Sequence, residues 1–518
     1  MNRFKIFSKD PISKQALIIS FFTFLSRVAG ALRDVLTAYF FQPAITDAFF
    51  LAFRIPNVFR QLLAEGAMNT GFIPILAYEK SKSSKHNYEV FLRSSLGLLI
   101  IILTFTCLLG IYIAPTLISI FAPGFIDQTE KFELATNLLK LCFPYLFFIA
   151  MCAYIAGILH VQNSFWAPSI SPVAFNAMMC ISIVFFSFFK ENWGYALGIG
   201  VIAGGIAQCL IHIVPLENRK LILKPSLDLK NKSIRKMLIL VIPSIPVLGI
   251  TQINIIVDSF FASLLEKGAI SALYYAARLL EFAMGIIPIA LATVTLPMFT
   301  SQIATNDIKG LEKNFTKTLF LTFFFIYPAF IGLLILSTPT IRFIFEHGNF
   351  KDSLVHATSI SLTGYVLGLI PFALNRIIIN SFYAFHDAKI PLIWSFFGMV
   401  ANILGDYLLF PYRELGLALS TSISGGLQFI GLSLTLKIRH GLNVGNMICS
   451  QLANSLISGI IMGIILWQIN QKFLMHMPLG LKFYASLPLL ILTAAMIYFS
   501  LFFVFKKLDI LFTRNQRF

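Results

Sequence analysis

The chain consists of long apolar runs separated by short polar connections. Runs of about 18 or more mostly apolar residues can cross a hydrocarbon core of about 30 Å as α-helices. Segments of about ten residues with alternating polarity, typical of membrane β-barrels, do not occur. The pattern therefore predicts an all-α polytopic membrane protein with about 14 transmembrane helices, near residues 15–41, 47–78, 90–113, 134–160, 167–188, 194–214, 237–263, 270–301, 315–337, 355–384, 390–410, 415–436, 447–469 and 483–505.

Three of these predicted spans are longer than one bilayer thickness, namely 47–78, 270–301 and 355–384. A helix that exceeds the local hydrocarbon thickness must tilt, kink or break. We therefore expect a tilt or an interruption in each of the three.

Charge is scarce and unevenly placed. Only 12% of the 518 residues are charged, against about 25% in soluble domains, and 57% are hydrophobic. With the N-terminus inside, the inner segments hold 24 Lys and Arg residues and the outer segments hold eight, which predicts both termini in the cytoplasm. The net charge of +17 thus reflects topology, and we expect no nucleic-acid partner. The six cysteines show no CxxC spacing, so buried thiols are expected instead of disulfides or a zinc site.

The sequence divides at a basic stretch, residues 216–236, and then repeats itself. FFLAFRIPN at 49–57 is similar to YYAARLLEF at 274–282, and FIPILA at 72–77 is similar to TLPMFT at 295–300. Chance similarity between apolar segments is the alternative. Internal repeats mark transporters whose halves rock about a central site. We predict an N-lobe of six helices (1–215), a basic cytoplasmic linker (216–236), a pseudo-symmetric C-lobe of six helices (237–440), and two extra helices with a cytoplasmic tail (441–518).

Ionisable residues concentrate in the first two predicted spans, between Ser26 and Pro74. They are Arg27, Arg33, Asp34, Asp47, Arg54, Arg60 and Glu65. Charge at membrane depth is costly, so it persists where it lines a wet cavity or is paired. Arginine presents a planar fork that suits phosphate, which makes Arg27, Arg33, Arg60 and the repeat-related Arg278 candidate ligands of a pyrophosphate. The alternative is local pairing with Asp34, Glu65 or Glu281.

Gly30 lies between two of these arginines in the first span. A glycine within a spanning helix permits a bend, which would make Gly30 a candidate gate. Close packing of small residues between helices explains it equally well.

A second polar group lies in the C-lobe. It comprises Asp258, then Asn402 and Asp406, which are four residues apart and share one helix face. Ser422 or Thr421 could add a hydroxyl. These oxygen donors suit a hard cation, so sodium is a candidate ligand; a hydrogen-bond network or a proton-titrating pair remains open.

The runs SRVAGALRD, TDAFF, RIPN, AEGA and FIP in the first 80 residues resemble the start of the MurJ/MviN family. Looser similarity continues to about residue 440, through LLKLCFPY at 138–145 and FYAFHDAKIP at 382–391. The family belongs to the multidrug/oligosaccharidyl-lipid/polysaccharide exporter superfamily. The resemblance implies a flippase that moves the lipid-linked peptidoglycan precursor, lipid II, across the bacterial cytoplasmic (inner) membrane by alternating access, for cell-wall synthesis.

The resemblance also implies roles for single residues. Arg27, Arg33, Arg60 and Arg278 would line a central cavity and bind the lipid II head group, while Asp34 and Glu65 would shape or gate it. Asp47 would lie near the outer ends of the first spans. Asp258, Asn402 and Asp406 resemble a sodium site of some relatives, and the last two spans would hold the polyprenyl tail in a groove. Many relatives have an acidic residue where this chain has Ala277, so either a local ion pair is missing there or its role passes to Glu281. The sequence does not place Arg376.

Other functions make different demands on the sequence. A flippase for another polyprenyl-linked oligosaccharide fits the same residues, whereas a cation-coupled drug exporter would need acids to dominate its cavity. A membrane enzyme acting on polyprenyl phosphates would need acidic motifs, and neither DDxxD nor HExxH occurs. The GxxxxGK[ST] loop of ATP-driven transport is also missing, and a scaffold would not need buried charge. We expect a transporter and not an enzyme, with lipid II (undecaprenyl-pyrophosphate-linked muropeptide) and membrane lipid as partners. We expect a monomer, with cell-wall synthesis enzymes as candidate protein partners and Na+ as the one candidate cofactor.

Overall fold

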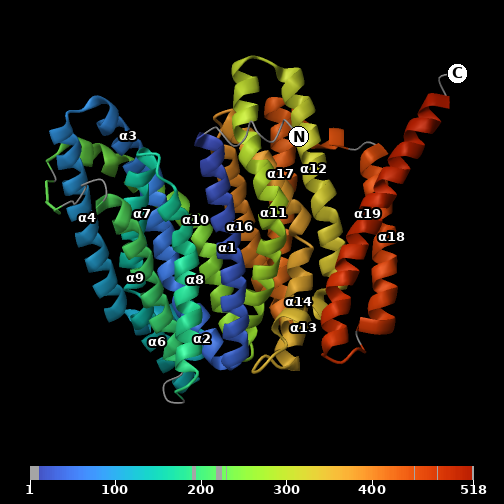
Figure 1. The fold of residues 1–518 in the computed structure, drawn as a ribbon, viewed down its shortest axis with the longest axis horizontal. Helices are drawn as coiled ribbons and strands as arrows, with labels where there is room; N and C mark the ends of the chain where they lie inside the picture. The colour runs from blue at the N-terminus through green and yellow to red at the C-terminus, as the bar shows by residue number, and fades with distance from the viewer. Residues whose placement is uncertain are drawn as a thin grey trace. The chain divides into compact units, whose positions relative to one another are not determined.

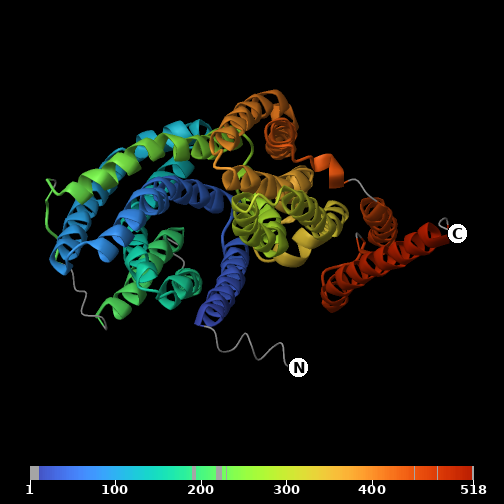
Figure 2. The ribbon, with the colours of Figure 1, turned by 90° about the horizontal axis from the view of Figure 1, so that it is seen from above.

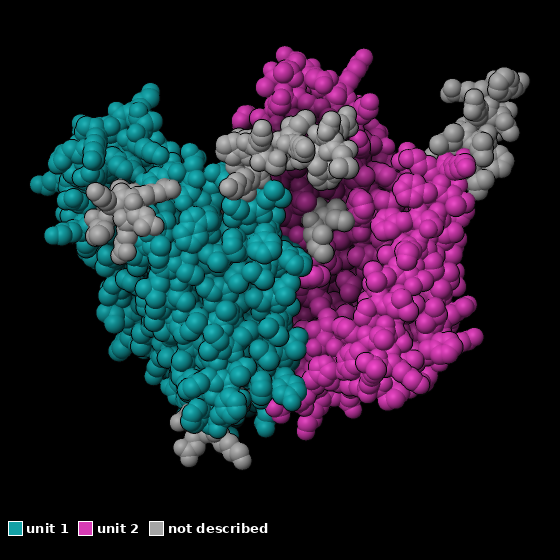
Figure 3. All heavy atoms as spheres, in the orientation of Figure 1, with its two compact units in different colours: residues 1–267 teal, residues 268–518 magenta. Residues whose placement is uncertain are grey.

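The computed structural model describes residues 11–189, 194–217, 224–228, 230–447, 450–474 and 476–515. Throughout these ranges the chain folds into helices joined by short connections, without a β-strand (Figure 1). The chain forms two compact units, Met1–Lys267 and Gly268–Phe518, which are coloured separately in Figure 3. The predicted all-α fold is confirmed.

The first unit holds the first ten α-helices. They are α1 (Pro11–Phe40), α2 (Pro43–Phe59), α3 (Ile73–Lys82), α4 (Lys85–Tyr112), α5 (Ala114–Phe121), α6 (Thr129–Cys142), α7 (Tyr145–Val161), α8 (Trp166–Phe186), α9 (Tyr195–Glu217) and α10 (Lys232–Ser263). Two π-helical segments, η1 (Arg60–Gly66) and η2 (Met68–Phe72), join α2 to α3, and a short 3-10 turn, η3 (Pro123–Phe125), follows α5.

The second unit holds the remaining nine α-helices. They are α11 (Ala269–Ala304), α12 (Ile308–Ile335), α13 (Ser337–Phe345), α14 (Asp352–Val366), α15 (Leu369–Ala384), α16 (Lys389–Leu409), α17 (Arg413–His440), α18 (Ser450–Ile469) and α19 (Leu481–Asn515). A 3-10 turn, η4 (Phe410–Tyr412), links α16 to α17, and η5 (Val444–Met447) precedes α18. A third π-helical segment, η6 (Asn470–Leu474), follows α18.

The two units repeat one order of elements. In each, a long helix (α4, α12) is followed by a short helix (α5, α13), an interrupted helix (α6–α7, α14–α15) and a pair of long helices (α8–α9, α16–α17). The short helices also share sequence, since APTLISIF at 114–121 resembles TPTIRFIF at 338–345. This similarity extends the repeat that the sequence predicted to a second region of each half.

All three over-long predicted spans are interrupted. The span at 47–78 contains η1 and η2, whose wider turns distort it in the middle. The span at 270–301 is bent by 49° between Gly285 and Pro288, and the span at 355–384 is bent by 42° between α14 and α15. A break shortens the axial length of each segment, as the thickness argument requires.

Each of the fourteen predicted spans coincides with a helix or an interrupted helix, and the chain is a multi-pass membrane protein. Within the described ranges, eight helices are individually long and apolar enough to cross a membrane, or up to ten when each of two bent pairs counts as one span. The predicted second span is divided into elements of 17 residues or fewer, so it does not reach that length as a single helix. The number fourteen stays a prediction.

Helix α10 packs within the first unit. Its Ser244 hydroxyl lies 3.1 Å from that of Thr70, and the Ser263 hydroxyl accepts a hydrogen bond from the Gly124 amide at 3.2 Å. The boundary between the compact units therefore follows α10, whereas the sequence placed the lobe boundary before it, at 216–236. The reason is that polar side chains of α10 find partners on η2 and η3, which the sequence pattern does not reveal. The predicted division into lobes stays a prediction.

The last two long helices belong to the core of the second unit. Helix α18 approaches α12 closely at Gly459, where an added Cβ would lie 2.2 Å from the Tyr327 ring. The Tyr498 hydroxyl of α19 donates to the Phe324 carbonyl of α12 at 3.0 Å, and Ser455 of α18 contacts the same hydroxyl. Figure 2 shows α18 and α19 side by side. A glycine contact of this kind lets two helices approach where lipid offers no hydrophobic driving force.

Five of the cysteines are free thiols among the described residues. Cys107, Cys142 and Cys152 are buried, as expected, whereas Cys180 and Cys209 are half-buried. The sixth, Cys449, lies outside the described residues.

Candidate functional site

Arg33 is a buried arginine in the middle of the first unit. Its Nε and Nη2 donate to Asp34 Oδ1 at 3.1 and 2.7 Å, and its Nη1 donates to Asn176 Oδ1 at 3.1 Å. Asn176 lies on α8, whereas Arg33 and Asp34 are neighbours on α1. A carboxylate and an amide therefore fix the plane of this guanidinium, and the sequence predicted only the carboxylate.

Gly30 lies where α1 and α8 meet. An added Cβ at Gly30 would lie 3.5 Å from Asn176 Nδ2, and this nitrogen donates to the Ser26 carbonyl at 3.1 Å. Helix α1 continues through Gly30 without a break. A methyl group at Gly30 would make ordinary van der Waals contact with Asn176, so both the bend and the close helix packing stay predictions.

Arg60 opens the first π-helical segment. Its Nε donates to Asn57 Oδ1 at 3.0 Å, and its Nη1 pairs with Glu65 on the same segment. The Glu65 side chain is 53% exposed, so this pair lies where solvent or a ligand can reach it. π-Helical turns concentrate at functional sites because they re-aim side chains that a regular helix would hold elsewhere.

Tyr145 connects the arginines of the first unit. Its phenol, on α7, lies within electrostatic range of Arg60, Arg33 and Glu65. The Tyr145 ring is buried against Phe175 at 5.2 Å between centroids. That Arg33, Arg60 and Glu65 line one cavity stays a prediction.

Arg27 and Arg54 complete the cationic residues of the first two helices. Arg27 is half-buried on α1, and it forms no ion pair with the residues that the structure describes. Arg54 on α2 donates from Nη1 to the Ser259 hydroxyl of α10 at 2.8 Å. Ser259 follows Asp258, which is half-buried on the same helix. The Arg54–Ser259 contact joins the charge-bearing α2 to α10, and the sequence did not identify it.

Arg278 is the corresponding arginine of the second unit. Its Nη1 pairs with Glu281 Oε2 at 2.8 Å, and its Nε and Nη2 each donate to the Tyr274 hydroxyl at 3.1 Å. All three residues lie on α11, one turn apart. The Glu281 carboxylate supplies the pairing that an acid in place of Ala277 would otherwise provide, which is one of the two alternatives considered above. Whether Arg278 faces the same cavity as the arginines of the first unit stays a prediction.

Asp47 forms a buried ion pair. Its Oδ2 accepts from Lys131 Nζ at 2.9 Å, and both side chains are less than 10% exposed. Lys131 Nζ also lies 4.0 Å from the centre of the Phe125 ring. The pair ties the start of α2 to the first turn of α6, so Asp47 anchors two helix ends.

Asn402 and Asp406 meet as their spacing predicts. The Asn402 amide donates to Asp406 Oδ2 at 3.2 Å, and both residues are buried. The hydroxyl that joins them is Ser420, which donates to Asp406 and lies 3.4 Å from Asn402 Oδ1. Asp258 lies on α10, in the first unit, and its part in such a site stays a prediction.

The two hydroxyls that the sequence proposed for this group point elsewhere. Ser422 donates to the Gly364 carbonyl of α14 at 2.7 Å, and Thr421 bonds to the Leu417 carbonyl of its own helix. Ser420 and Ser424 share the face of α17 that meets α16, because residues four apart lie above one another on a helix. Ser422 is half a turn away from Ser420. Arg376, which the sequence could not place, is exposed on α15.

Among the described residues, no group of three or more His, Cys, Asp or Glu is arranged to hold a metal ion. The oxygen donors of Asn402, Asp406 and Ser420 are nevertheless of the type that hard monovalent cations bind. The residues present therefore fit sodium in donor chemistry.

Comparison with known proteins identifies one family. Residues 36–487 match the family described as "Lipid II flippase MurJ". The probable lipid II flippase MurJ of Buchnera aphidicola subsp. Schizaphis graminum is 35% identical over 424 residues, covering 81% of this chain and 82% of the relative. That of Vibrio cholerae serotype O1 is 34% identical over 478 residues, covering 90% and 91%.

Solved structures give the same result. The structure described as "Lipid II flippase MurJ, inward closed conformation" superposes with a TM-score of 0.78 at 28% identity, over 97% of this chain and all of the other. An inward-facing multidrug resistance MATE family transporter of the MOP superfamily superposes with a TM-score of 0.66 at 15% identity, which shows a shared fold alone.

Proposed function

This chain belongs to the lipid II flippase MurJ family, and we propose that it carries lipid II from the inner to the outer leaflet of the bacterial cytoplasmic membrane, for cell-wall synthesis. The family match over residues 36–487 supports this proposal. The observation that carries the mechanism is Arg33, a buried arginine whose plane is fixed by Asp34 and Asn176. A guanidinium of fixed orientation recognises a diphosphate with little loss of side-chain entropy.

The arginines bind the head group by exchanging partners. Arg60–Glu65 and Arg278–Glu281 are ion pairs with exposed carboxylates, 53% and 64%. Exposed pairs contribute little to stability, about 0–1 kcal/mol before screening by solvent. A diphosphate oxygen can therefore replace the carboxylate at small cost, and the bidentate arginine–phosphate contact exceeds what is lost. Arg27 adds a further positive charge on α1.

The two units give the transport cycle its moving parts. Transporters built from repeats alternate access by rocking one repeat against the other about a central site. The head group enters from the inner leaflet while the polyprenyl tail stays in lipid beside α18 and α19. Membrane potential acts on the positively charged site at about 2.3 kcal/mol per unit charge per 100 mV.

Sodium is proposed as a coupling ion. Asn402, Asp406 and Ser420 would hold it, with Asp258 as the further ligand that the sequence indicates. Bound sodium would supply one positive charge that neutralises the buried carboxylate of Asp406. The topology that we propose places both termini in the cytoplasm, and the functional form that we propose is a monomer that works with cell-wall synthesis enzymes.

Complementation tests the function. A bacterial host is depleted of its resident lipid II flippase and supplied with this chain, either intact or with Arg27, Arg33, Arg60 or Arg278 changed to alanine. Lipid II on the outer face, growth and protein level are measured. Arg439→Ala is the matched control, because Arg439 pairs with Asp387 at the end of α17, outside the proposed site.

The outcomes separate substrate from mechanism. Rescue by the intact chain and by Arg439→Ala, with loss in the four site variants, supports head-group binding by the arginines. Failure of a correctly inserted intact chain points to another polyprenyl-linked oligosaccharide as the substrate. Rescue by all four site variants contradicts the arginine mechanism while leaving the substrate in place.

A further inference from the structure

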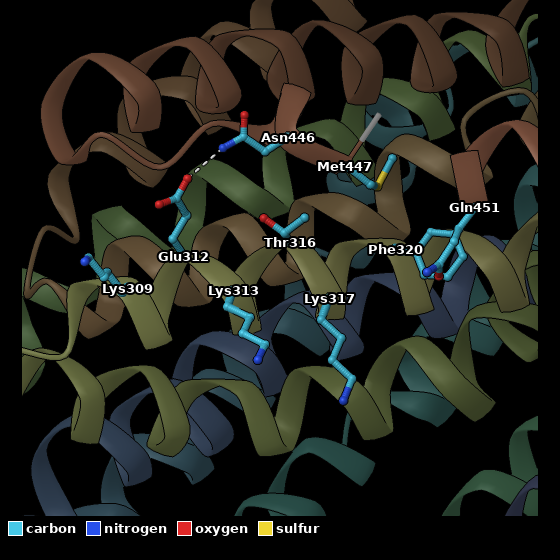
Figure 4. A pocket seen from close by; sticks show the side chains of 9 residues that line it. All are labelled: Lys309, Glu312, Lys313, Thr316, Lys317, Phe320, Asn446, Met447 and Gln451. Atoms are coloured by element: carbon cyan, nitrogen blue, oxygen red, sulfur yellow. Dashed lines mark hydrogen bonds between the residues drawn. The ribbon is translucent and has the colours of Figure 1, made fainter. Parts of the chain in front are cut away.

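A polar pocket lies in the second unit, at the start of α12. It has a volume of about 450 Å³ and is bordered by the first turns of α12, by η5 and by the start of α18. Lys309, Lys313 and Lys317 line it from α12, and Figure 4 shows their side chains spaced along that helix. None of these residues has a part in the arginine site or the Asn402–Asp406 group.

The three lysines form one stripe of positive charge. They are four residues apart, so they lie on one face of α12 and span about 12 Å at about 1.5 Å per residue. The lining contains one carboxylate, Glu312, whose Oε1 accepts a hydrogen bond from Asn446 Nδ2 at 2.7 Å (Figure 4). The charged lining therefore carries two net positive charges, and Thr316 and Gln451 add uncharged polar groups.

The lining also includes two apolar residues. They are Phe320, which follows the lysines on α12, and the buried Met447 of η5. The Phe320 ring packs against Phe324 and Phe502, with centroids 5.9 and 6.3 Å apart. Helix α12 carries no charged residue after Lys317. The pocket thus marks the level at which a membrane-spanning helix passes from charged to apolar, which is where phospholipid phosphates lie.

We propose that this pocket binds the head group of an anionic glycerophospholipid. The lysine ammonium groups neutralise the phosphate, the Thr316 hydroxyl and the Gln451 amide bond to the glycerol or phosphate oxygens, and an acyl chain lies along Phe320. Basic pockets between membrane helices recognise anionic lipids in this way. A soluble phosphate would leave the apolar residues unused, and a zwitterionic head group would bring its own cation against the lysines.

The bound lipid also has a structural role. It contacts α12 and α18 at the end where η5 joins α18 to the preceding helix, α17. Because it contacts both helices, the lipid stabilises the packing of α18 on α12. This consequence does not depend on which substrate the protein transports.

Native mass spectrometry of the purified full chain in detergent tests the proposal. The chain is titrated with phosphatidylglycerol and, separately, with phosphatidylcholine of the same acyl chains. The test variant is Lys309→Gln/Lys313→Gln/Lys317→Gln. The matched control is Lys224→Gln/Lys230→Gln/Lys232→Gln, which removes the same charge from exposed lysines of the first unit. A triple Lys→Arg variant of the pocket keeps the charge.

We expect phosphatidylglycerol to bind in preference to phosphatidylcholine. The test variant should lose affinity by at least about tenfold, while the control and the arginine variant keep theirs. Equal loss in the control variant, or equal binding of both lipids, contradicts the proposal. Full displacement of phosphatidylglycerol by millimolar inorganic phosphate shows a soluble-anion site and also contradicts it.

Two further measurements keep the result independent of the transport function. Lipid II binding is measured on the same variants. A test variant that loses lipid II binding but keeps phosphatidylglycerol binding assigns the pocket to the substrate and overturns the proposal. Complementation by the test variant with normal flipping, together with lost phosphatidylglycerol binding, supports a lipid site separate from the arginines.

Discussion

The Arg33 guanidinium and the Asn176 amide oxygen meet between α1 and α8 at 3.1 Å. The same asparagine donates to the Ser26 carbonyl and packs over Gly30. One neutral side chain thus sets both the orientation of a buried arginine and the approach of two helices. Residues of this kind bind no substrate themselves, yet they determine where the charge points.

Asn176→Ala removes the orientation of Arg33 without removing its charge. A hydrogen bond to a charged group is worth about 1.5–3 kcal/mol, so we expect lipid II exposure on the outer face to fall by about tenfold or more. Arg33→Ala should abolish it. Asn137→Ala is the control, since Asn137 bonds to Tyr195 at an exposed position. Full activity of Asn176→Ala at normal protein level contradicts the positioning role.

Glu281→Gln tests the exchange of partners at Arg278. The variant leaves Arg278 without its carboxylate, so lipid II should bind to the detergent-solubilised protein slightly more tightly, by no more than about fivefold. Arg278→Ala should weaken binding, and Arg278→Lys should restore it only in part because lysine lacks the bidentate fork. Weaker binding by Glu281→Gln would show that the carboxylate supports the site and does not compete for it.

Asp47→Asn should destabilise the first unit by about 3 kcal/mol, because it leaves the buried Lys131 ammonium uncompensated. The double variant Asp47→Leu/Lys131→Met should recover most of that loss. Thermal unfolding in detergent measures both. Glu89→Gln, which breaks the exposed pair with Arg93, is the control and should change stability little. Equal effects of the buried and the exposed variants would rule out the anchoring role.

Sodium dependence distinguishes Ser420 from Ser422 on α17. If Asn402, Asp406 and Ser420 hold sodium, sodium should raise the thermal stability of the intact chain. Asp406→Asn should abolish that increase, and Ser420→Ala should reduce it. Ser422→Ala should leave it unchanged, because Ser422 bonds to Gly364 on α14. An intact chain equally stable in sodium and in choline buffers removes sodium as the coupling ion.

Gly459→Ala should separate α18 from α12. The new methyl group would overlap the Tyr327 ring, and overpacking of this kind costs about 1–3 kcal/mol. Gly426→Ala is the matched control, because nothing lies within 4 Å of its added Cβ. Both changes gain the same helix propensity. A melting temperature that falls only for Gly459→Ala, measured in detergent, establishes the contact; equal melting temperatures refute it.

Much of the fold could be predicted from the sequence because membrane helices are recognisable by their length and apolar composition. The interruptions of three over-long spans followed from bilayer thickness. Contacts within one helix could also be predicted, since Arg278 and Glu281 lie three residues apart and Asn402 and Asp406 lie four apart on regular helices.

Partners from distant helices could not be predicted. Arg33 and Asn176 are 143 residues apart, and a single sequence does not fix the rotation of α1 against α8. Ser420 and Ser422 differ by two positions on a helix that is apolar or small on several faces, so the pattern could not show which one meets α16. For the same reason the contacts of α10, which assign it to the first compact unit, were not foreseen.

The short helices α5 and α13 share a backbone and a sequence pattern but not their chemistry. In α13, Arg342 and Glu346 pair at 2.6 Å. The corresponding residues of the first copy are Ile118 and Ala122, which are fully buried. The two short helices therefore share a shape and differ in charge. An ion pair at one of them stands where the other has packed apolar side chains, so α5 could not replace α13 without removing that ion pair.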